Sequence, residues 1–325
     1  MTSALGPDDP TAHPQPPEPD GSLVRRLVLD QFPQWSHLLV TAVVPGGVDN
    51  RTFRLGDELS VRLPAGPGYA AQVAKEQRWL PLLAERLPLP IPAPVGLGRP
   101  GQGYPFPWSV YRWIEGESAV ATGVPDVIAF AADLARFLVA LRRADPTEGP
   151  GPGEHCFFRG GSLATYEDET LAAIETLAML GDSVGAGVDP SACRAVWGAA
   201  TAPVNESWQG DPVWFRGDVA VGNLLVRDGR LAAVIDFGTC GVGDPACDLV
   251  IAWTLFEGDG RAAFRRTVDL DAGTWARARG WALWKALITL VGALDGGLDE
   301  DFGGQRDKVE GARHTVEAVL LDAGP

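Results

Sequence analysis

Lysine, cysteine and histidine are scarce in this sequence. Three lysines, four cysteines and four histidines are spread over 325 residues. No C-x-x-C pair occurs, and no histidine lies at the spacing of a zinc ligand, which excludes the common zinc sites. Scattered cysteines in a chain of this length predict free thiols, and therefore a cytoplasmic protein.

Long apolar runs are also missing. The longest, residues 281–294, is interrupted by Lys285 and is too short to cross a bilayer, so it predicts a buried helix. The first residues are rich in proline and acid, and we expect no secretory leader there. Residues 1–21 predict a disordered tail.

Positive charge is outweighed by negative charge. The chain has 27 Lys and Arg against 42 Asp and Glu, a formal net charge of -15. Nucleic acids and anionic membrane surfaces bind clustered Lys and Arg, so we expect neither as a partner. The excess of acid is compatible with a cationic substrate, although a net charge does not describe one pocket.

Several motifs of catalysis and nucleotide binding are absent. The sequence contains no G-x-x-x-x-G-K-[ST], no H-E-x-x-H and no G-x-S-x-G. Residues 96–101 (GLGRPG) match G-x-G-x-x-G, but Pro100 and Gly103 lead into another strand rather than into a helix. This stretch therefore predicts a turn and not a dinucleotide site.

Two parts of the chain differ in their periodicity. In the first part, period-two stretches with short turns predict an antiparallel meander at residues 37–44, 51–55 and 59–64. A helix over 69–87, which Pro81 would bend or interrupt, precedes two strands within 95–117. From about residue 124 the pattern is mostly helical, except for short strands within 213–236. It predicts helices over 125–144, 163–180, 190–201, 247–257, 274–296 and 305–322. These patterns predict an α+β protein with a β-rich N-lobe at 22–113 and a mostly helical C-lobe at 114–325.

Asp218, Asn223 and Asp236 form the most informative chemical pattern. The stretch RGDVAVGN (216–223) places an acid and an amide on a tight loop between two strands, and VIDFG (234–238) ends a buried strand with an acid. Asp, Gly and Asn are also ordinary turn residues, which is the alternative for the first stretch alone. Together they supply the oxygen ligands that Mg²⁺ takes beside substrate phosphates. Protein kinases combine the same parts.

With these motifs in order, the sequence resembles the aminoglycoside phosphotransferase family of kinase-like enzymes. The resemblance extends over about residues 38–322 and rests on FRGDVAVGNLLV, VIDFGTCGVGDPACDL, the turn PGGVDNRTFRL, the strand LSVRLP and the crossing YRWIEGE. It implies a bilobal protein-kinase-like fold. It also implies transfer of the γ-phosphoryl group of ATP or GTP to a hydroxyl of a small molecule.

The resemblance implies a role for each residue of the pattern. Asp218 would be the catalytic base that orients the acceptor hydroxyl, and Asn223 and Asp236 would bind Mg²⁺. Asp248 would bond back to the catalytic loop and brace it. The crossing between the lobes, with Trp113, would present backbone groups to the adenine.

The N-lobe would hold the phosphates of the nucleotide. The turn with Gly46, Gly47 and Asn50 would cover them with backbone N–H groups, which are natural anion ligands. Arg62, paired with Glu76, would stand where phosphotransferases usually place a lysine. Arginine is always charged and forks onto phosphate, but it is longer and planar.

Two further positions depart from the family pattern, and the acceptor stays open. Arg216 replaces a histidine and Thr239 replaces an acid, which leaves a nucleotide-binding module without turnover as an alternative. The default acceptor is an aminoglycoside-type antibiotic, as in antibiotic resistance. Macrolide, choline, homoserine and sugar kinases are alternatives. The acidic stretch 294–304 is expected to be a solvated loop rather than the wall of a cationic pocket. The sequence predicts no particular oligomeric state.

Overall fold

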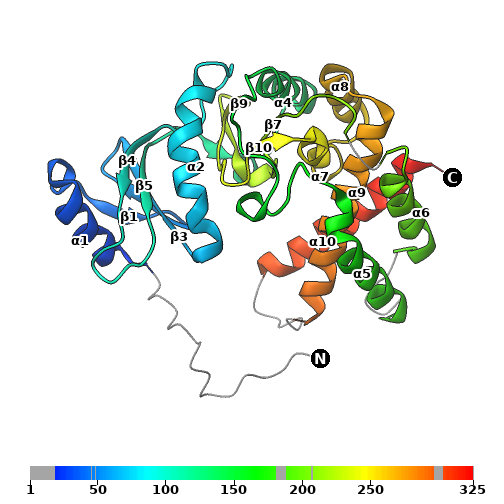
Figure 1. The fold of residues 1–325 in the computed structure, drawn as a ribbon, viewed down its shortest axis with the longest axis horizontal. Coiled ribbons are helices and arrows are strands. Elements are labelled where there is room, and N and C mark those ends of the chain that lie inside the picture. Colours follow the sequence, from blue (N-terminus) through cyan, green and yellow to red (C-terminus); the bar gives the residue numbers. More distant parts are fainter. Residues whose placement is uncertain are drawn as a thin grey trace. The chain divides into compact units, whose positions relative to one another are not determined.

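The structure is a computed structural model of the chain (Figure 1). It describes residues 19–44, 46–47, 49–180, 188–205, 208–295 and 303–324. Residues 1–18 of the predicted tail therefore lie outside the described residues. Helix α1 (Gly21–Gln31) begins at the end of that tail, where Asp20 caps it by accepting a hydrogen bond of 2.8 Å from the backbone N–H of Leu23.

The chain forms two compact units. The first unit comprises residues 1–77 and 94–113, and the second comprises residues 78–93 and 114–325. Helix α2 (Pro67–Ala84) contributes to both units. The sequence predicts that Pro81 bends or interrupts this helix, and the structure shows that the helix continues through Pro81. In its last turns Trp79, Leu80 and Leu83 are buried, and the ring of Trp79 lies 5.1 Å from that of Trp214, which belongs to the same unit as Trp79. This packing compensates for the backbone hydrogen bond that proline cannot make. The functional division into a lobe at 22–113 and a lobe at 114–325 stays a prediction.

The first unit is built on one antiparallel sheet. Its strands lie in the order β1-β2-β3-β5-β4. They are β1 (Val40–Ala42), β2 (Asn50–Leu55), β3 (Leu59–Pro64), β4 (Pro94–Gly98) and β5 (Trp108–Arg112). Helix α1 packs its apolar side chains Leu23 and Leu27 into the same core as Phe53, Val61 and Trp108 of the sheet. The predicted meander is therefore confirmed, and the segment after β4 turns back into β5 as an antiparallel pair rather than opening a helix.

The second unit is mostly helical (Figure 1). Its α-helices are α3 (Ala119–Thr122), α4 (Val127–Arg142), α5 (Glu167–Leu180), α6 (Pro190–Thr201), α7 (Ile251–Thr254), α8 (Gly258–Val268), α9 (Ala272–Asp295) and α10 (Gly303–Ala323). Among the helices within the described ranges, none combines the length and apolarity needed to cross a bilayer. A single helix expected over 247–257 is instead the 3-10 helix η6 (Pro245–Val250) followed by the short α7.

Two small sheets lie inside the helical unit. Strand β7 (Val213–Phe215) pairs with β10 (Gly241–Gly243), and β8 (Leu224–Arg227) pairs with both β6 (Glu117–Ser118) and β9 (Arg230–Val234). The strands predicted within 213–236 are therefore present. Together they hold the two ends of the loop that carries Asp218.

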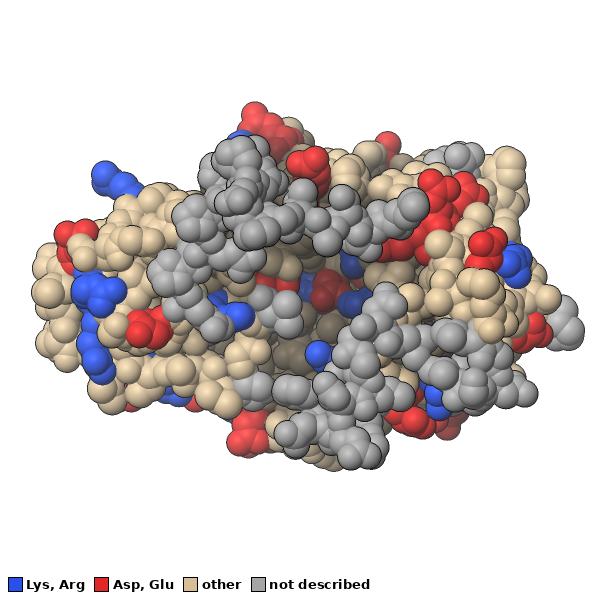
Figure 2. Space-filling view, turned by 90° about the horizontal axis from the view of Figure 1, so that it is seen from below, with Lys and Arg blue, Asp and Glu red and all other residues tan. Residues whose placement is uncertain are grey.

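Charged side chains of both signs lie on the face drawn in Figure 2. In the described part of that face, Lys and Arg (blue) and Asp and Glu (red) are interspersed among uncharged residues (tan). This arrangement differs from the basic stripe that is typical of nucleic-acid-binding proteins.

Candidate active site

The loop between β7 and β8 holds Asp218 on a fixed backbone. Gly217 has a φ of +91°, a conformation that glycine adopts freely and other residues adopt only with strain. A Cβ atom at this position would lie 2.5 Å from the carbonyl oxygen of Thr239. Both the conformation and the close approach therefore require glycine directly before Asp218.

Asp248 stabilises the same loop through backbone hydrogen bonds. Its carboxylate accepts hydrogen bonds from the backbone N–H groups of Arg216 (2.8 Å) and Gly217 (2.6 Å), which confirms the brace implied by the resemblance. Burial raises the pKa of Asp248 from 3.8 to about 6, although both backbone N–H groups and the charge of Arg216 counteract it.

Arg216 ties the loop to the segment that precedes Asp236. Its guanidinium is buried, and Nη2 donates a 2.7 Å hydrogen bond to the carbonyl oxygen of Ile235. The hydroxyl of Thr239 donates to the carbonyl oxygen of Arg216 at 3.0 Å. The two residues that depart from the family pattern thus both contribute to holding this loop.

Asn223 and Asp236 lie at one end of the β8–β9 hairpin. The strands pair Leu224 with Val234, and the backbone N–H of Ile235 donates to the carbonyl oxygen of Asn223 at 2.9 Å. The side-chain amide of Asn223 donates to the carbonyl oxygen of Asp218 at 3.4 Å. Backbone and side-chain hydrogen bonds therefore connect the segments that carry Asp218, Asn223 and Asp236.

The donors at this end of the hairpin suit a metal ion that keeps other ligands. Within the described ranges, no three His, Cys, Asp or Glu side chains are grouped so that they could hold a metal ion by themselves. An amide oxygen from Asn223 and a carboxylate from Asp236 are hard ligands. They fit Mg²⁺ that retains water and substrate phosphates in its shell.

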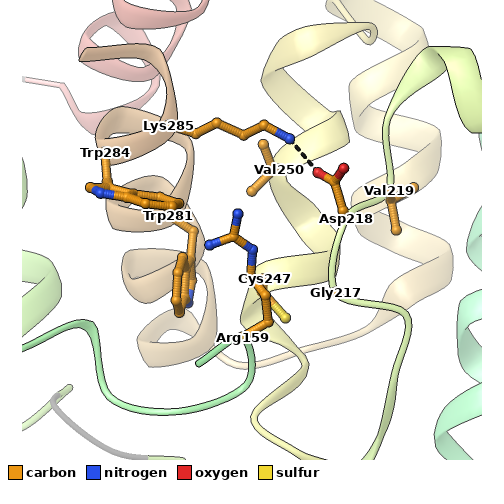
Figure 3. A pocket seen from close by; sticks show the side chains of 9 residues that line it. All are labelled: Arg159, Gly217, Asp218, Val219, Cys247, Val250, Trp281, Trp284 and Lys285. Atoms are coloured by element: carbon orange, nitrogen blue, oxygen red, sulfur yellow. Dashed lines mark hydrogen bonds and ion pairs between the residues drawn. The ribbon is translucent and has the colours of Figure 1, made fainter. Parts of the chain in front are cut away.

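Lys285 contacts Asp218, a contact that the sequence analysis missed. Its ammonium, on helix α9, donates a hydrogen bond to Oδ1 of Asp218 (Figure 3). Burial pushes the pKa of Asp218 upward, but the charges of Lys285, Arg216 and Arg159 outweigh it and hold the pKa below its ordinary value. Asp218 is therefore a carboxylate at neutral pH.

A small pocket lies beside this ion pair (Figure 3). Its enclosed part has room for about one water molecule, within about 230 Å³ of non-atom space that includes open solvent. The residues that line it come from the Asp218 loop, from η6, from helix α9 and from the segment before α5: Arg159, Gly217, Asp218, Val219, Cys247, Val250, Trp281, Trp284 and Lys285. The pocket thus combines the Asp218 carboxylate with two cations and two indole rings.

The first unit brings together the other predicted ion pair. Nη1 of Arg62 lies 3.7 Å from Oε1 of Glu76, and both side chains are largely buried. The Tyr111 hydroxyl donates to the other oxygen of Glu76. Burial, and then the charge of Glu76, raises the pKa of Tyr111 well above its ordinary value, so it stays a donor. Tyr111 carries no sequence signal that marks it out.

The glycine turn lies between two paired strands. Gly46 and Gly47 follow β1, and Asn50 begins β2. The guanidinium of Arg51 donates to the carbonyl oxygen of Gly47 at 2.8 Å, and a Cβ atom on Gly47 would lie 3.1 Å from the carbonyl oxygen of Asn50. Two other positions of this turn, 45 and 48, lie outside the described residues. The phosphate-covering role of the turn stays a prediction.

Trp113 ends the first unit. Its backbone N–H donates to the carbonyl oxygen of Glu58 at 2.7 Å, and the guanidinium of Arg54 lies 4.3 Å above its ring. Its backbone is therefore held by β-sheet neighbours. Its place beside the adenine stays a prediction.

Comparison with known proteins identifies the family. The model of the phosphotransferase enzyme family matches residues 40–281. The comparison with curated proteins gave no match. Three solved structures share the fold at low sequence identity. They are a GDP complex of wild-type aminoglycoside 2'-phosphotransferase-IIIa (TM-score 0.65, 19% identity, 94% of this chain and 100% of that chain), ADP-bound aminoglycoside phosphotransferase APH(2'')-Ib (TM-score 0.55, 17%, 93% and 99%), and macrolide 2'-phosphotransferase MphH from Brachybacterium faecium (TM-score 0.56, 20%, 91% and 97%).

These likenesses confirm the predicted fold class. The α+β architecture, with a sheet-rich N-terminal part and a helical C-terminal part, is that of kinase-like phosphotransferases. The family model spans the glycine turn, the Arg62 strand, the Asp218 loop and the Asp236 segment. The chain therefore belongs to the phosphotransferase enzyme family.

Proposed function

We propose that this phosphotransferase transfers the γ-phosphoryl group of ATP or GTP to a hydroxyl of a small molecule, with Mg²⁺ as its metal. The observation that carries the proposal is the interlocked frame of the second unit. There Asp248, Arg216 and Thr239 hold the Asp218 loop against the segment that carries Asp236. Phosphoryl transfer requires mainly positioning and charge stabilisation, which a rigid set of oxygen donors supplies.

Asp218 is proposed to orient the acceptor hydroxyl. Its lowered pKa keeps it ionised at neutral pH, so it can accept the hydrogen bond of a hydroxyl and take its proton as transfer proceeds. Lys285 occupies one of its oxygens and would have to share that oxygen with the acceptor. The loop geometry thus favours a base that is already oriented in the absence of ligand over a base that is oriented only when the ligand binds.

Asn223 and Asp236 are proposed to hold Mg²⁺ at the end of the β8–β9 hairpin. When bound, the ion would neutralise charge on the phosphates of the nucleotide. Asn223 also keeps its side-chain amide on the backbone of Asp218, so the residue that would contact the metal and the proposed base are mechanically linked.

The nucleotide is proposed to bind the first unit. Structures of relatives are named as complexes with GDP and with ADP, which supports either base. Arg62, held by Glu76, would contact the phosphates, and the turn with Gly46, Gly47 and Asn50 would supply backbone N–H groups.

The role of Arg62 can be measured by nucleotide binding. We expect Arg62→Ala to weaken ATP binding about tenfold or more, because a charge-assisted hydrogen bond is lost. Arg62→Lys should retain most of the affinity, since the charge stays on the strand. Equal affinities of the wild type and Arg62→Ala by isothermal titration calorimetry would remove Arg62 from the phosphate site.

The first acceptors to assay are aminoglycoside-type antibiotics. Structures of relatives include a complex with kanamycin and a complex with gentamicin, and other relatives are named as macrolide phosphotransferases. Phosphorylation of such a compound would make the protein a resistance enzyme. Choline, homoserine and sugars extend the panel to metabolic acceptors.

The test is a product screen. The protein is incubated with Mg-ATP or Mg-GTP and each hydroxyl compound, and mass spectrometry follows the gain of one phosphoryl group. We expect one acceptor class to be phosphorylated, and removal of Mg²⁺ by a chelator to stop the reaction. Tight nucleotide binding without a phosphorylated product from any acceptor would favour a nucleotide-binding module without turnover.

A further inference from the structure

The pocket beside Asp218 has a local charge opposite to that of the whole chain. Its described lining contains one carboxylate, Asp218, and two cations, Arg159 and Lys285. The chain as a whole has a formal net charge of -15. Short-range contacts, and not the net charge, decide which ligand a pocket accepts.

The guanidinium of Arg159 lies against two indole rings, and one of its nitrogens lacks an acceptor among the described residues. The guanidinium lies 5.1 Å from the ring centre of Trp281 and 4.5 Å from that of Trp284. Its Nη1 atom is buried and has no hydrogen-bond partner within the described part of the chain. A buried donor without an acceptor costs free energy, and a ligand that supplies the acceptor recovers it.

The direction of the side chain agrees with a ligand site. Figure 3 shows the guanidinium of Arg159 between the indoles of helix α9 and the carboxylate of Asp218. Arg159 also lowers the pKa of Asp218 through its charge, so the two groups are close enough to interact. Arg159 therefore faces the space next to the proposed base.

Lys285 is the second donor of this space. Its ammonium donates a hydrogen bond to Oδ1 of Asp218. An acceptor hydroxyl would approach the same carboxylate. An incoming anionic group can take over the ammonium and leave Asp218 to the hydroxyl. An incoming ammonium would instead compete with Lys285 for Asp218 and lie beside Arg159, where like charges repel.

Nearby acids have other partners. Glu169 accepts a 2.6 Å hydrogen bond from the indole Nε1 of Trp284, and Asp248 accepts the two backbone N–H groups of the Asp218 loop. Among the described lining residues, only Asp218 could therefore neutralise a cationic ligand.

We infer that the acceptor carries an anionic group, a carboxylate or a phosphate, near its reacting hydroxyl, and that Arg159 and Lys285 bind this group. The inference rests on the proposed function and changes the expected substrate class from a polycationic aminoglycoside to an anionic hydroxyl compound. The enclosed part of the pocket has room for about one water molecule, so the anionic group would bind at the solvent-open side of Arg159 and Lys285, with the rest of the acceptor outside. The planar guanidinium of Arg159 matches the paired oxygens of either anion.

Three probes of one shape separate the charge classes. Benzoate, phenyl phosphate and benzylamine share an aromatic ring and differ in the charged group. Kanamycin serves as the polycationic compound. Their binding to the full chain is measured by isothermal titration calorimetry with Mg²⁺ and a non-hydrolysable ATP analogue present. We expect at least one of the two anions to bind at least about tenfold more tightly than benzylamine or kanamycin. The stronger of the two anions identifies carboxylate or phosphate.

Variants of Arg159 connect binding to the pocket. Arg159→Gln should weaken binding of the anion about tenfold or more, and Arg159→Lys should weaken this binding less, because the charge is retained. The matched control is Arg194→Gln, an exposed arginine of the same unit that pairs with Glu175, and it should bind the anion as the wild type does. Thermal unfolding of each variant verifies that it is folded.

Two results would overturn the inference. One is binding of benzylamine or kanamycin as tight as that of both anions, and the other is unchanged anion binding in a folded Arg159→Gln variant. The product screen keeps the two proposals apart. Anion binding without transfer to any acceptor retains the anionic pocket and refutes the proposed function. Efficient transfer to kanamycin without anion binding retains the function and refutes the anionic pocket.

Discussion

At the scale of single residues, the position of Asp218 is set by its neighbours rather than by Asp218 itself. Gly217 supplies a positive φ next to the backbone of Thr239, and Asp248 fixes two N–H groups of the loop. The guanidinium of Arg216 then attaches the loop to Ile235, one residue before Asp236. The backbone of the Asp218 loop is therefore fixed by contacts within the protein, and positioning of reacting groups is a main source of acceleration in phosphoryl transfer.

Gly217→Ala tests this fixed backbone. The added methyl group would lie 2.5 Å from the carbonyl oxygen of Thr239, and alanine at φ +91° is strained by about 1–2 kcal/mol before any clash. We expect a loss of at least about 2 kcal/mol in the free energy of unfolding by urea titration. Gly222→Ala, in the same loop, is the control. A Cβ atom at this position meets no described atom within 4 Å, so the free energy of unfolding of this variant should stay within about 0.5 kcal/mol of the wild type. Equal stability of the two variants would show that the loop tolerates a side chain.

Asp248 makes stability depend on pH. Its folded-state pKa is about 6 against an ordinary value of 3.8, so the fold favours the neutral acid. This contribution to stability is fully present below about pH 3.8 and is lost as the pH rises through 6, by about 3 kcal/mol in total. Asparagine does not titrate, so the unfolding free energy of Asp248→Asn relative to that of the wild type should rise by about 3 kcal/mol between pH 4 and pH 7. A difference in unfolding free energy that is independent of pH would contradict the raised pKa.

At the scale of elements, helix α9 connects the site to the rest of the helical unit. Trp281, Trp284 and Lys285 face the pocket from this helix, while Arg277 reaches η6. Nε of Arg277 lies 2.6 Å from Oδ2 of Asp244, and both side chains are almost fully buried. The same η6 carries Asp248, so α9 and the brace of the Asp218 loop share one support.

Arg277→Ala should be strongly destabilising. It leaves the Asp244 carboxylate buried without its partner, a change that costs about 3–5 kcal/mol in unfolding free energy. Burial already raises the pKa of Asp244 against the pull of Arg277. Arg279→Ala is the control on the same helix. Its partner Asp322 keeps a second arginine, Arg265, so denaturant titration should show a loss of about 1 kcal/mol or less. Equal losses in the two variants would contradict a special role for the buried pair.

The sequence predicted the elements that have strong local patterns. Period-two apolar residues predict the strands, and the acid and amide motifs predict the loop between β7 and β8. Helix α8 (GDGRAAFRRTV) was not predicted, because it has few apolar residues and becomes stable by packing against α4. Arg159 and Lys285 were missed as site residues, since only tertiary folding brings them to Asp218. Lys285 did leave a signal: it is a charge inside an apolar helix, and such a charge needs a partner.

At the scale of the whole molecule, the proposed nucleotide-binding residues and the proposed catalytic residues lie in different units. The first unit contains the Arg62–Glu76 pair and the glycine turn, and the second contains Asp218, Asn223 and Asp236. The family and the fold assign the reaction class, whereas the acceptor depends on the charges of one pocket. The acidic chain and this pocket differ in the sign of their charge, so the net charge of the chain does not predict the ligand of the pocket.

The most direct test of the account is the turnover of Asp218→Asn with the acceptor that the product screen identifies. Asparagine keeps the size of the side chain and removes its charge and basicity. We expect nucleotide affinity within about twofold of the wild type and kcat lower by about 10²–10⁴-fold, the usual effect of removing a general base. An Asp218→Asn variant that phosphorylates the acceptor at the wild-type rate would contradict the role of Asp218, and with it the proposed site.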